Sequence, residues 1–127
     1  MKREKKPFLL VEDFEDSRFM MRRLLEMAGY NVIEATDGEQ AVRIAVEARP
    51  ALILMDLSLP KMDGLAATRS IRQKRGLKRV PIVAVSAHDS DESRAEALDA
   101  GCNEYVTKPI DFDRLNDLIQ KFLGPKA

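Results

Sequence analysis

The sequence has little of several features that mark other classes of protein. Its 127 residues include one cysteine, Cys102, and no tryptophan, and no apolar run approaches the length of a membrane span. A lone cysteine cannot form an internal disulfide, and the charged start MKREKKP lacks the apolar core of a signal peptide. These absences argue against a disulfide-stabilised secreted scaffold, and we expect a cytoplasmic protein that does not insert into membranes.

Net charge is also missing. Lysine plus arginine and aspartate plus glutamate number 21 each, so the formal net charge is zero. Such a chain has no long-range attraction for polyanions, and we expect no direct binding to nucleic acid. The length fits a single domain, 1–127, with its core at about 8–123.

Short apolar runs of strand length alternate with segments of helical period. In the first helical segment, Met21, Leu24, Leu25 and Ala28 follow the i, i+3, i+4, i+7 spacing of one helix face. The segment 90–100 is densely charged and short on large apolar residues, so we expect it to dock shallowly. The expected strands are 8–11, 31–35, 51–55, 81–87 and 104–107, and the expected helices are 16–29, 38–48, 64–75, 90–100 and 111–123.

Five successive strand-then-helix units predict an α/β fold. The near-continuous apolar strands indicate a parallel sheet covered by helices on both faces. Right-handed crossovers fix most of the topology, and we expect a doubly wound five-stranded sheet of order 2-1-3-4-5 with five helices, the flavodoxin-like arrangement. In such sheets, ligands bind beyond the carboxyl ends of the strands.

Polar side chains stand at the ends of four expected strands: Glu12 and Asp13, Asp56, Ser86, and Lys108. Crowded carboxylates repel one another by about 4 kcal/mol per pair at about 4 Å when the effective dielectric is near 20. Lys108 can neutralise part of that charge, and the oxygen ligands favour Mg²⁺. Taken singly, Glu12 or Asp13 could instead cap a helix, and Asp56 could form a turn.

Four motifs carry a family resemblance. VEDFED (11–16), MDLSLPKMDG (55–64), VSA (85–87) and YVTKP (105–109), in this order and spacing, resemble the receiver domain of two-component response regulators. The resemblance implies that Asp56 accepts a phosphoryl group from the phosphohistidine of a sensor histidine kinase or a histidine phosphotransfer protein. It implies a phosphoacceptor that catalyses its own phosphorylation and dephosphorylation, not a conventional enzyme.

The resemblance also implies a metal site. Asp13 and Asp56 would ligate Mg²⁺ together with the backbone carbonyl of Ser58, and Glu12 would assist through a metal-bound water. Glu12 departs from the aspartate that is common in the family at this position, although a glutamate–aspartate pair also occurs there. Ser58 and His88 would border the phosphoryl group and tune its hydrolysis, whereas a lone loop histidine is ordinarily just solvated.

A switch is implied at the neighbouring strands. Lys108 and Ser86 would bind phosphoryl oxygens, and Pro109 would follow a cis peptide bond. Movement of Ser86 would let Tyr105 turn inward and change the surface formed by the fourth helix, fifth strand and fifth helix. Without the resemblance, Ser86 would be interpreted as a strand-end hydroxyl and Tyr105 as a half-buried packing ring. Asp63-Gly64 is most simply a turn and helix start.

The first expected helix also carries apolar residues on its outer side. A step of about 100° per residue places Phe19 nearly opposite the core-facing stripe. We expect Phe14, Phe19 and Met20 to form a docking patch for a histidine-bearing partner helix. The alternative is that Phe19 lies on the stems of Arg22 and Arg23.

Functions from other classes fit the residues less well. A haloacid-dehalogenase-type phosphatase needs a second acid two residues after its nucleophile, where this chain has Ser58. A flavin- or dinucleotide-binding protein needs a glycine-rich turn where this chain has EDFEDS. A receiver-like interaction module that no longer turns over phosphate is the stronger rival. Only Glu12 favours it, and four intact residues argue against it: Asp13, Asp56, Ser86 and Lys108.

The chain is expected to act by contact. No DNA-binding or enzymatic segment follows Leu123, so we expect no attached output domain and a downstream protein target. The chain could also be a piece of a longer regulator or hybrid kinase. As for assembly, we expect a monomer or a weak dimer that depends on phosphorylation.

Overall fold

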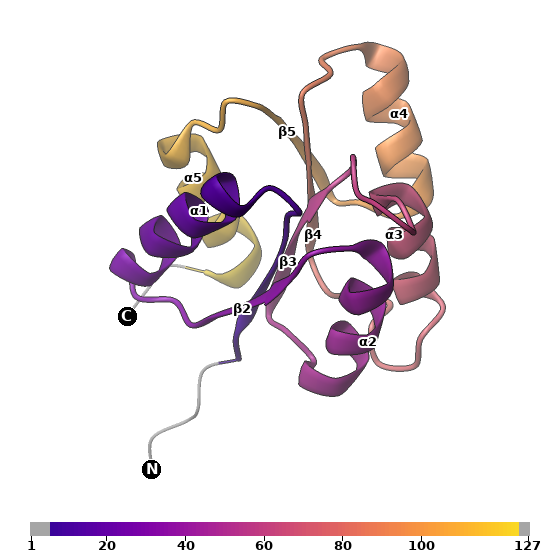
Figure 1. Cartoon of the computed structure of the whole chain (residues 1–127), viewed down its shortest axis with the longest axis horizontal. Helices are drawn as coiled ribbons and strands as arrows, with labels where there is room; N and C mark the ends of the chain where they lie inside the picture. The colour runs from indigo at the N-terminus through magenta and orange to yellow at the C-terminus, as the bar shows by residue number, and fades with distance from the viewer. Residues whose placement is uncertain (1–5, 125–127) are drawn as a thin grey trace.

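The computed structural model describes residues 6–124, so the outermost residues of the expected 1–127 domain lie outside the described residues. Strands and helices alternate along this part of the chain (Figure 1). The strands are β1 (Phe8–Val11), β2 (Val32–Ala35), β3 (Leu52–Asp56), β4 (Ile82–Ser86) and β5 (Glu104–Thr107). The helices are α1 (Glu15–Met27), α2 (Gly38–Ala48), α3 (Gly64–Arg72), α4 (Asp91–Ala100) and α5 (Phe112–Leu123).

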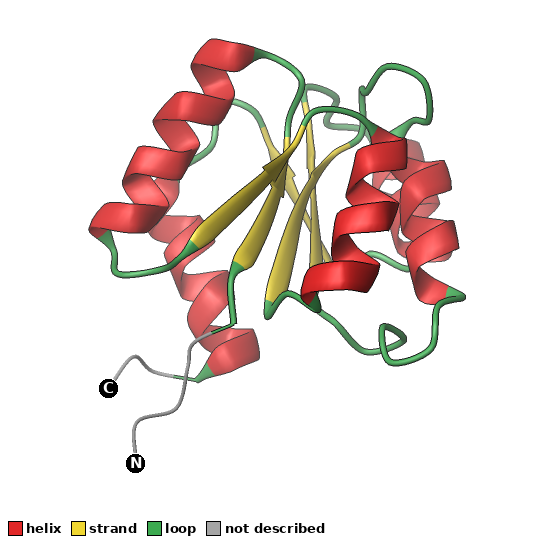
Figure 2. Cartoon of the chain, turned by 60° about the horizontal axis from the view of Figure 1, so that its bottom comes forward, coloured by secondary structure: helices red, strands yellow, loops and turns green. Residues whose placement is uncertain are grey.

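The strands form one sheet, drawn in yellow in Figure 2. All of its pairings are parallel and its order is β2-β1-β3-β4-β5, which confirms the predicted topology. Asp56 is the last residue of β3 and pairs in register with Val85, whereas the expected strand ended at residue 55. Pairing with β4 therefore continues one residue beyond the apolar run. This pairing holds the Asp56 backbone firmly at the edge where the strands end.

The helices cover both faces of the sheet, as predicted (Figures 1 and 2). One core cluster joins α1 and α5 to residues such as Leu10, Leu54 and Val106, and the other joins α2, α3 and α4 to Leu9 and Ile53. Strands β1, β3 and β4 are buried along their whole length, which explains their near-continuous apolar sequences.

The helices begin in two different ways. Four of them have a side-chain cap at the N-terminus, in which an oxygen accepts a backbone N–H of the first turn. These caps are Asp37, Asp63, Ser90 and Asp111. In the described part of the chain, α1 alone begins without one, after Phe14. Neither Glu12 nor Asp13 is the N-cap residue of α1, although Glu12 Oε2 accepts the backbone N–H of Phe14 at 3.1 Å.

Two expectations about the helices need correction. Helix α3 ends at Arg72, three residues before the expected 75, and the chain then turns through Gly76 at φ +84°. In α1, Met21 and Leu25 are buried as predicted, but Leu24 and Ala28 are only half-buried. Within residues 6–124, every helix is too short or too polar to cross a bilayer.

Candidate functional site

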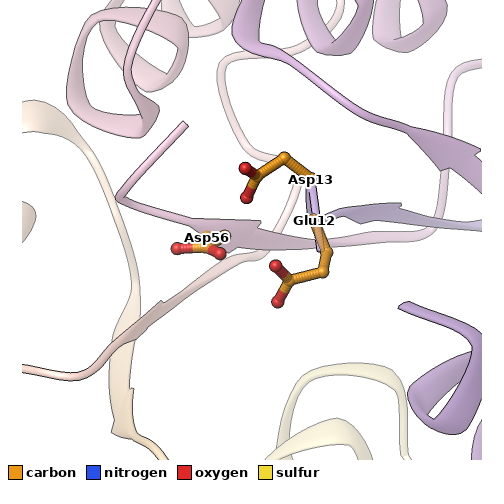
Figure 3. A group of neighbouring side chains, drawn as sticks. All are labelled: Glu12, Asp13 and Asp56. Atoms are coloured by element: carbon orange, nitrogen blue, oxygen red, sulfur yellow. The ribbon is translucent and has the colours of Figure 1, made fainter. Parts of the chain in front are cut away.

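Three carboxylates converge at the carboxyl ends of β1 and β3 (Figure 3). Glu12 and Asp13 follow β1, Asp56 ends β3, and one oxygen atom from each lies within 4.8 Å of the others. Glu12 and Asp56 are buried, with exposed fractions of 7% and 4%, while Asp13 is exposed. The predicted convergence of these acids is thus found, with Asp13 on the solvent side.

Lys108, the residue directly after β5, contacts two of these carboxylates. Its Nζ donates to Glu12 Oε1 and to Asp56 Oδ2, each at 3.1 Å. The Lys108–Pro109 peptide bond is cis, as the resemblance implies. The lysine therefore bridges two buried carboxylates from positions far along the chain.

The electrostatics reflect this crowding. Burial raises the pKa of Glu12, and the neighbouring Asp56 carboxylate raises it further, against the opposing effects of the Phe14 N–H and of Lys108. Partial burial works to lower the pKa of Lys108, but hydrogen bonds and charge attraction from Asp56 and Glu12 outweigh it, so this pKa is raised. The site thus favours a bound positive charge.

The donor set suits a hard divalent cation. All three members of the cluster are carboxylates, and Mg²⁺ prefers oxygen ligands. With neither thiolate nor imidazole in the cluster, it does not resemble a zinc site. Ser58 lies beside it, and its backbone N–H donates to Asp56 Oδ1 at 2.9 Å. The role of the Ser58 carbonyl as a ligand stays a prediction.

Gly64 supports the site in a way that sequence reasoning missed. Asp63 caps α3 by accepting from Ala66 N at 2.8 Å, so the expected helix start is confirmed. Gly64, however, is required by a close approach: a Cβ atom there would clash with the Asp56 carbonyl oxygen and lie 2.7 Å from Leu57 Cα. Gly64 therefore packs directly against the backbone of Asp56 and Leu57.

Ser86, His88 and Tyr105 form a connected group at the ends of β4 and β5. Ser86 is buried, and its Oγ accepts from the backbone N–H of His88 at 3.1 Å. The Tyr105 hydroxyl donates to the His88 carbonyl oxygen at 2.7 Å. Tyr105 is only 3% exposed, so the ring is buried and not half-buried. The side chain of His88 is exposed.

The three apolar residues predicted to be exposed at α1 and its N-terminus are exposed. Phe14, Phe19 and Met20 have exposed fractions of 60%, 61% and 65%. The Arg23 guanidinium carbon lies 5.9 Å from the centroid of the Phe19 ring, whereas Arg22 pairs with Glu26. Phe19 therefore contacts one of the two expected arginines and still presents most of its surface to solvent.

A cavity of about 460 Å³ lies beside this patch and was not predicted. Met20, Met21 and Leu24 of α1 form one wall, and the residues after β5 form another. Glu12, Asp56 and Lys108 also line it. Its walls come from segments far apart in the sequence, so no local sequence pattern predicts it.

Comparisons with known proteins agree with this geometry. The family model of the response regulator receiver domain matches residues 8–120. The polar-differentiation response regulator DivK of Brucella anthropi is 35% identical over 119 residues, covering 94% of this chain and 97% of that protein.

Solved structures agree as well. The receiver domain of the sensor histidine kinase PA1611 from Pseudomonas aeruginosa, with magnesium coordinated in its active-site cleft, is 38% identical with a TM-score of 0.89. The match covers 96% of this chain and all of that one. The Vibrio cholerae chemotaxis protein CheY4 is 29% identical with a TM-score of 0.88, over 94% of this chain and all of the other. This chain therefore belongs to the response regulator receiver domain family.

Proposed function

We propose that this receiver domain, spanning residues 1–127, accepts a phosphoryl group on Asp56 from a phosphohistidine and signals by contact with a downstream protein. The observation that carries the proposal is the Asp56 carboxylate, buried at the end of β3 and 3.1 Å from Lys108 Nζ. A held carboxylate beside a fixed cation is what attack on an anionic phosphoryl group requires.

Transfer of the phosphoryl group from histidine to Asp56 needs no further reactant. An Asp56 carboxylate oxygen attacks phosphorus, the bond from phosphorus to the imidazole nitrogen breaks, and its electron pair stays on that nitrogen. The product is an acyl phosphate on Asp56. Lys108, which now bridges Glu12 and Asp56, is positioned to bind a phosphoryl oxygen. Ser86 Oγ accepts from His88 N–H, so the serine hydroxyl hydrogen is available to a second phosphoryl oxygen.

The acidic cluster supports a metal role for these residues. Asp13, Asp56 and the backbone carbonyl of Ser58 would hold Mg²⁺, with Glu12 taking part through a water. Bound Mg²⁺ would neutralise charge on the phosphoryl oxygens during transfer. Asp13 faces solvent, so the cation can enter without opening the core.

Tyr105 and His88 would carry the signal outward. The His88 backbone forms hydrogen bonds with both Ser86 Oγ and the Tyr105 hydroxyl. A movement of Ser86 towards the phosphoryl group would therefore displace the His88 backbone and, with it, the acceptor of the Tyr105 hydroxyl. The α4, β5 and α5 surface would then shift between two populations. Ser58 and His88, whose side chains are exposed, would tune the hydrolysis of the phosphoryl group by limiting the access of water.

Phe14, Phe19 and Met20 would receive the phosphodonor, a sensor histidine kinase or a histidine phosphotransfer protein. Their exposure and the adjoining apolar cavity support this assignment. Phe19→Ala should slow transfer from a cognate partner but leave phosphorylation by acetyl phosphate intact. Met27→Ala is the matched control, since Met27 is 77% exposed at the far end of α1. Equal slowing by both variants would contradict a specific patch.

The first test is intact-protein mass after incubation with acetyl phosphate, with and without Mg²⁺. The wild-type protein should gain the mass of one phosphoryl group only when Mg²⁺ is present, and hydroxylamine should release that group. Asp56→Asn should gain none, and Asp117→Asn, which changes an exposed acid of α5, should behave as wild type. An unmodified wild type under every condition would favour a receiver-like interaction module.

A further inference from the structure

Arg94 of α4 covers the buried ring of Tyr105. The guanidinium carbon lies 4.9 Å from the ring centroid, within the range of a cation–π contact. Arg94 Nη2 also donates to Asp89 Oδ1 at 2.6 Å, which orients the guanidinium from the loop before α4. The hydrogen bond with Asp89 raises the pKa of Arg94. A charged side chain thus links α4 to β5.

Tyr105 is therefore held at two points. Its hydroxyl donates to the His88 carbonyl oxygen at 2.7 Å, and its ring is covered by Arg94. The hydroxyl contact belongs to the loop after β4, and the ring contact belongs to α4. Because α4 buries only alanines, Ala97 and Ala100, against the core, a polar contact from this helix matters more than it would on a helix with large buried side chains.

We propose that Arg94 is a positioning residue that keeps the Tyr105 ring inward and thereby couples the orientation of α4 to the loop containing His88. The inference rests on the proposed function only where it treats Tyr105 as part of the switch. Outward movement of the ring requires the guanidinium to leave the ring face, so α4 and Tyr105 move together. The simpler rival is that packing and the hydroxyl bond hold Tyr105, while Arg94 only lies over it.

Fluorine NMR of protein labelled with 3-fluorotyrosine separates these alternatives. The chain has two tyrosines, Tyr30 and Tyr105, so the spectrum has two side-chain signals, and Tyr30→Phe assigns them. Tyr30 stacks on Phe8 at 4.5 Å between ring centroids and serves as an internal reference. Access of a soluble paramagnetic agent to each signal reports how often the ring reaches solvent.

The decisive variant is Arg94→Met, in which a long side chain can still lie over the ring but the cation is removed. We expect the outward-to-inward ratio of Tyr105 to rise about two- to fivefold, the amount that an exposed cation–π contact supports. Arg94→Lys should restore most of the protection, since an ammonium can also lie over the ring. Arg43→Met is the matched control, because Arg43 forms an exposed ion pair with Glu47 on α2.

The proposal is overturned if Arg94→Met leaves the shift and solvent access of Tyr105 at their wild-type values, or if Arg43→Met changes them equally. It is also overturned if Arg94→Lys behaves like Arg94→Met, because the cation would then have no part. The spectra are recorded without a phosphodonor. Failure of Asp56 to become phosphorylated would therefore refute the proposed function and leave this comparison intact.

Discussion

Helices α4 and α5 flank the same strand, β5, but are attached to the sheet in different ways. Helix α5 buries Leu115 and Ile119 completely, and Phe112, Leu118 and Phe122 pack partly against the same cluster. Helix α4 buries Ala97 and Ala100 and leaves Leu98 55% exposed. In Figure 1, α4 lies at the upper right, on the opposite face of the sheet from α5.

The difference indicates which of the two helices can change its position more easily. Burying a large aliphatic side chain contributes about 1.5–3 kcal/mol, and an alanine contributes much less. Helix α5 is therefore fixed by its apolar face, while α4 is held by small residues and by polar contacts such as that of Arg94 with Tyr105. Under the proposed function, we therefore expect a shift at the end of β4 to reorient α4 more easily than α5.

Truncating the apolar face of α5 should have the largest effect. Ile119→Ala removes a fully buried side chain and should lower the free energy of unfolding by about 2–5 kcal/mol. Urea denaturation followed by circular dichroism measures the change.

The matched truncation on α4 is Leu98→Ala. Because Leu98 is mostly exposed, its cost should stay within about 0.5 kcal/mol. Similar losses from the two variants would show that the helices are held alike, and the contrast between them would fail.

Removing the N-caps should give the next largest effects and separate local from global stability. Asp111 caps α5 and Ser90 caps α4, and an alanine at either position costs about 1 kcal/mol of helix stability. Asp111→Ala should lower the global free energy of unfolding by most of that amount. Ser90→Ala should instead speed hydrogen exchange of the α4 amides while global stability changes less. An equal global loss from both variants would contradict this division.

Most of the fold could be predicted because its signals are local. Apolar runs and helical periods are local features, and the strand-end positions of Glu12, Asp56 and Lys108 follow from the parallel topology. The shallow docking expected for 90–100 agrees with the alanines that α4 buries.

What could not be predicted depends on contacts between distant segments. Tyr105 packs in the core cluster shared with α2, α3 and α4, and His88 and Arg94 also contact it from the loop before α4 and from α4 itself. Gly64 is needed because α3 starts against the Asp56 carbonyl, a closeness that no local pattern encodes. The end of α3 was misplaced for a related reason: Arg72 donates to the backbone oxygens of Leu77 and Gly101 as the chain turns away.

Removing the Tyr105 hydroxyl should have a moderate effect on the α4 side of β5. In Tyr105→Phe, the His88 carbonyl loses its donor, and the free energy of unfolding should fall by about 0.5–1.5 kcal/mol. Faster exchange of amides in the loop before α4, with unchanged exchange in α5, would place the loss on the α4 side. Exchange that rises equally in both helices would instead indicate a general loosening of β5.

A small effect is also expected from removing the ion pair that joins β5 to α5. Lys121 Nζ lies 2.9 Å from Glu104 Oε2, but the lysine side chain is 62% exposed, so solvent and salt screen the attraction. Lys121→Met should cost at most about 1 kcal/mol, and the difference from wild type should shrink further in high salt. Denaturation at low and high ionic strength measures both quantities. A loss comparable to that of Ile119→Ala would mean that charge, and not the buried apolar face, fixes α5, and the contrast with α4 would then need another cause.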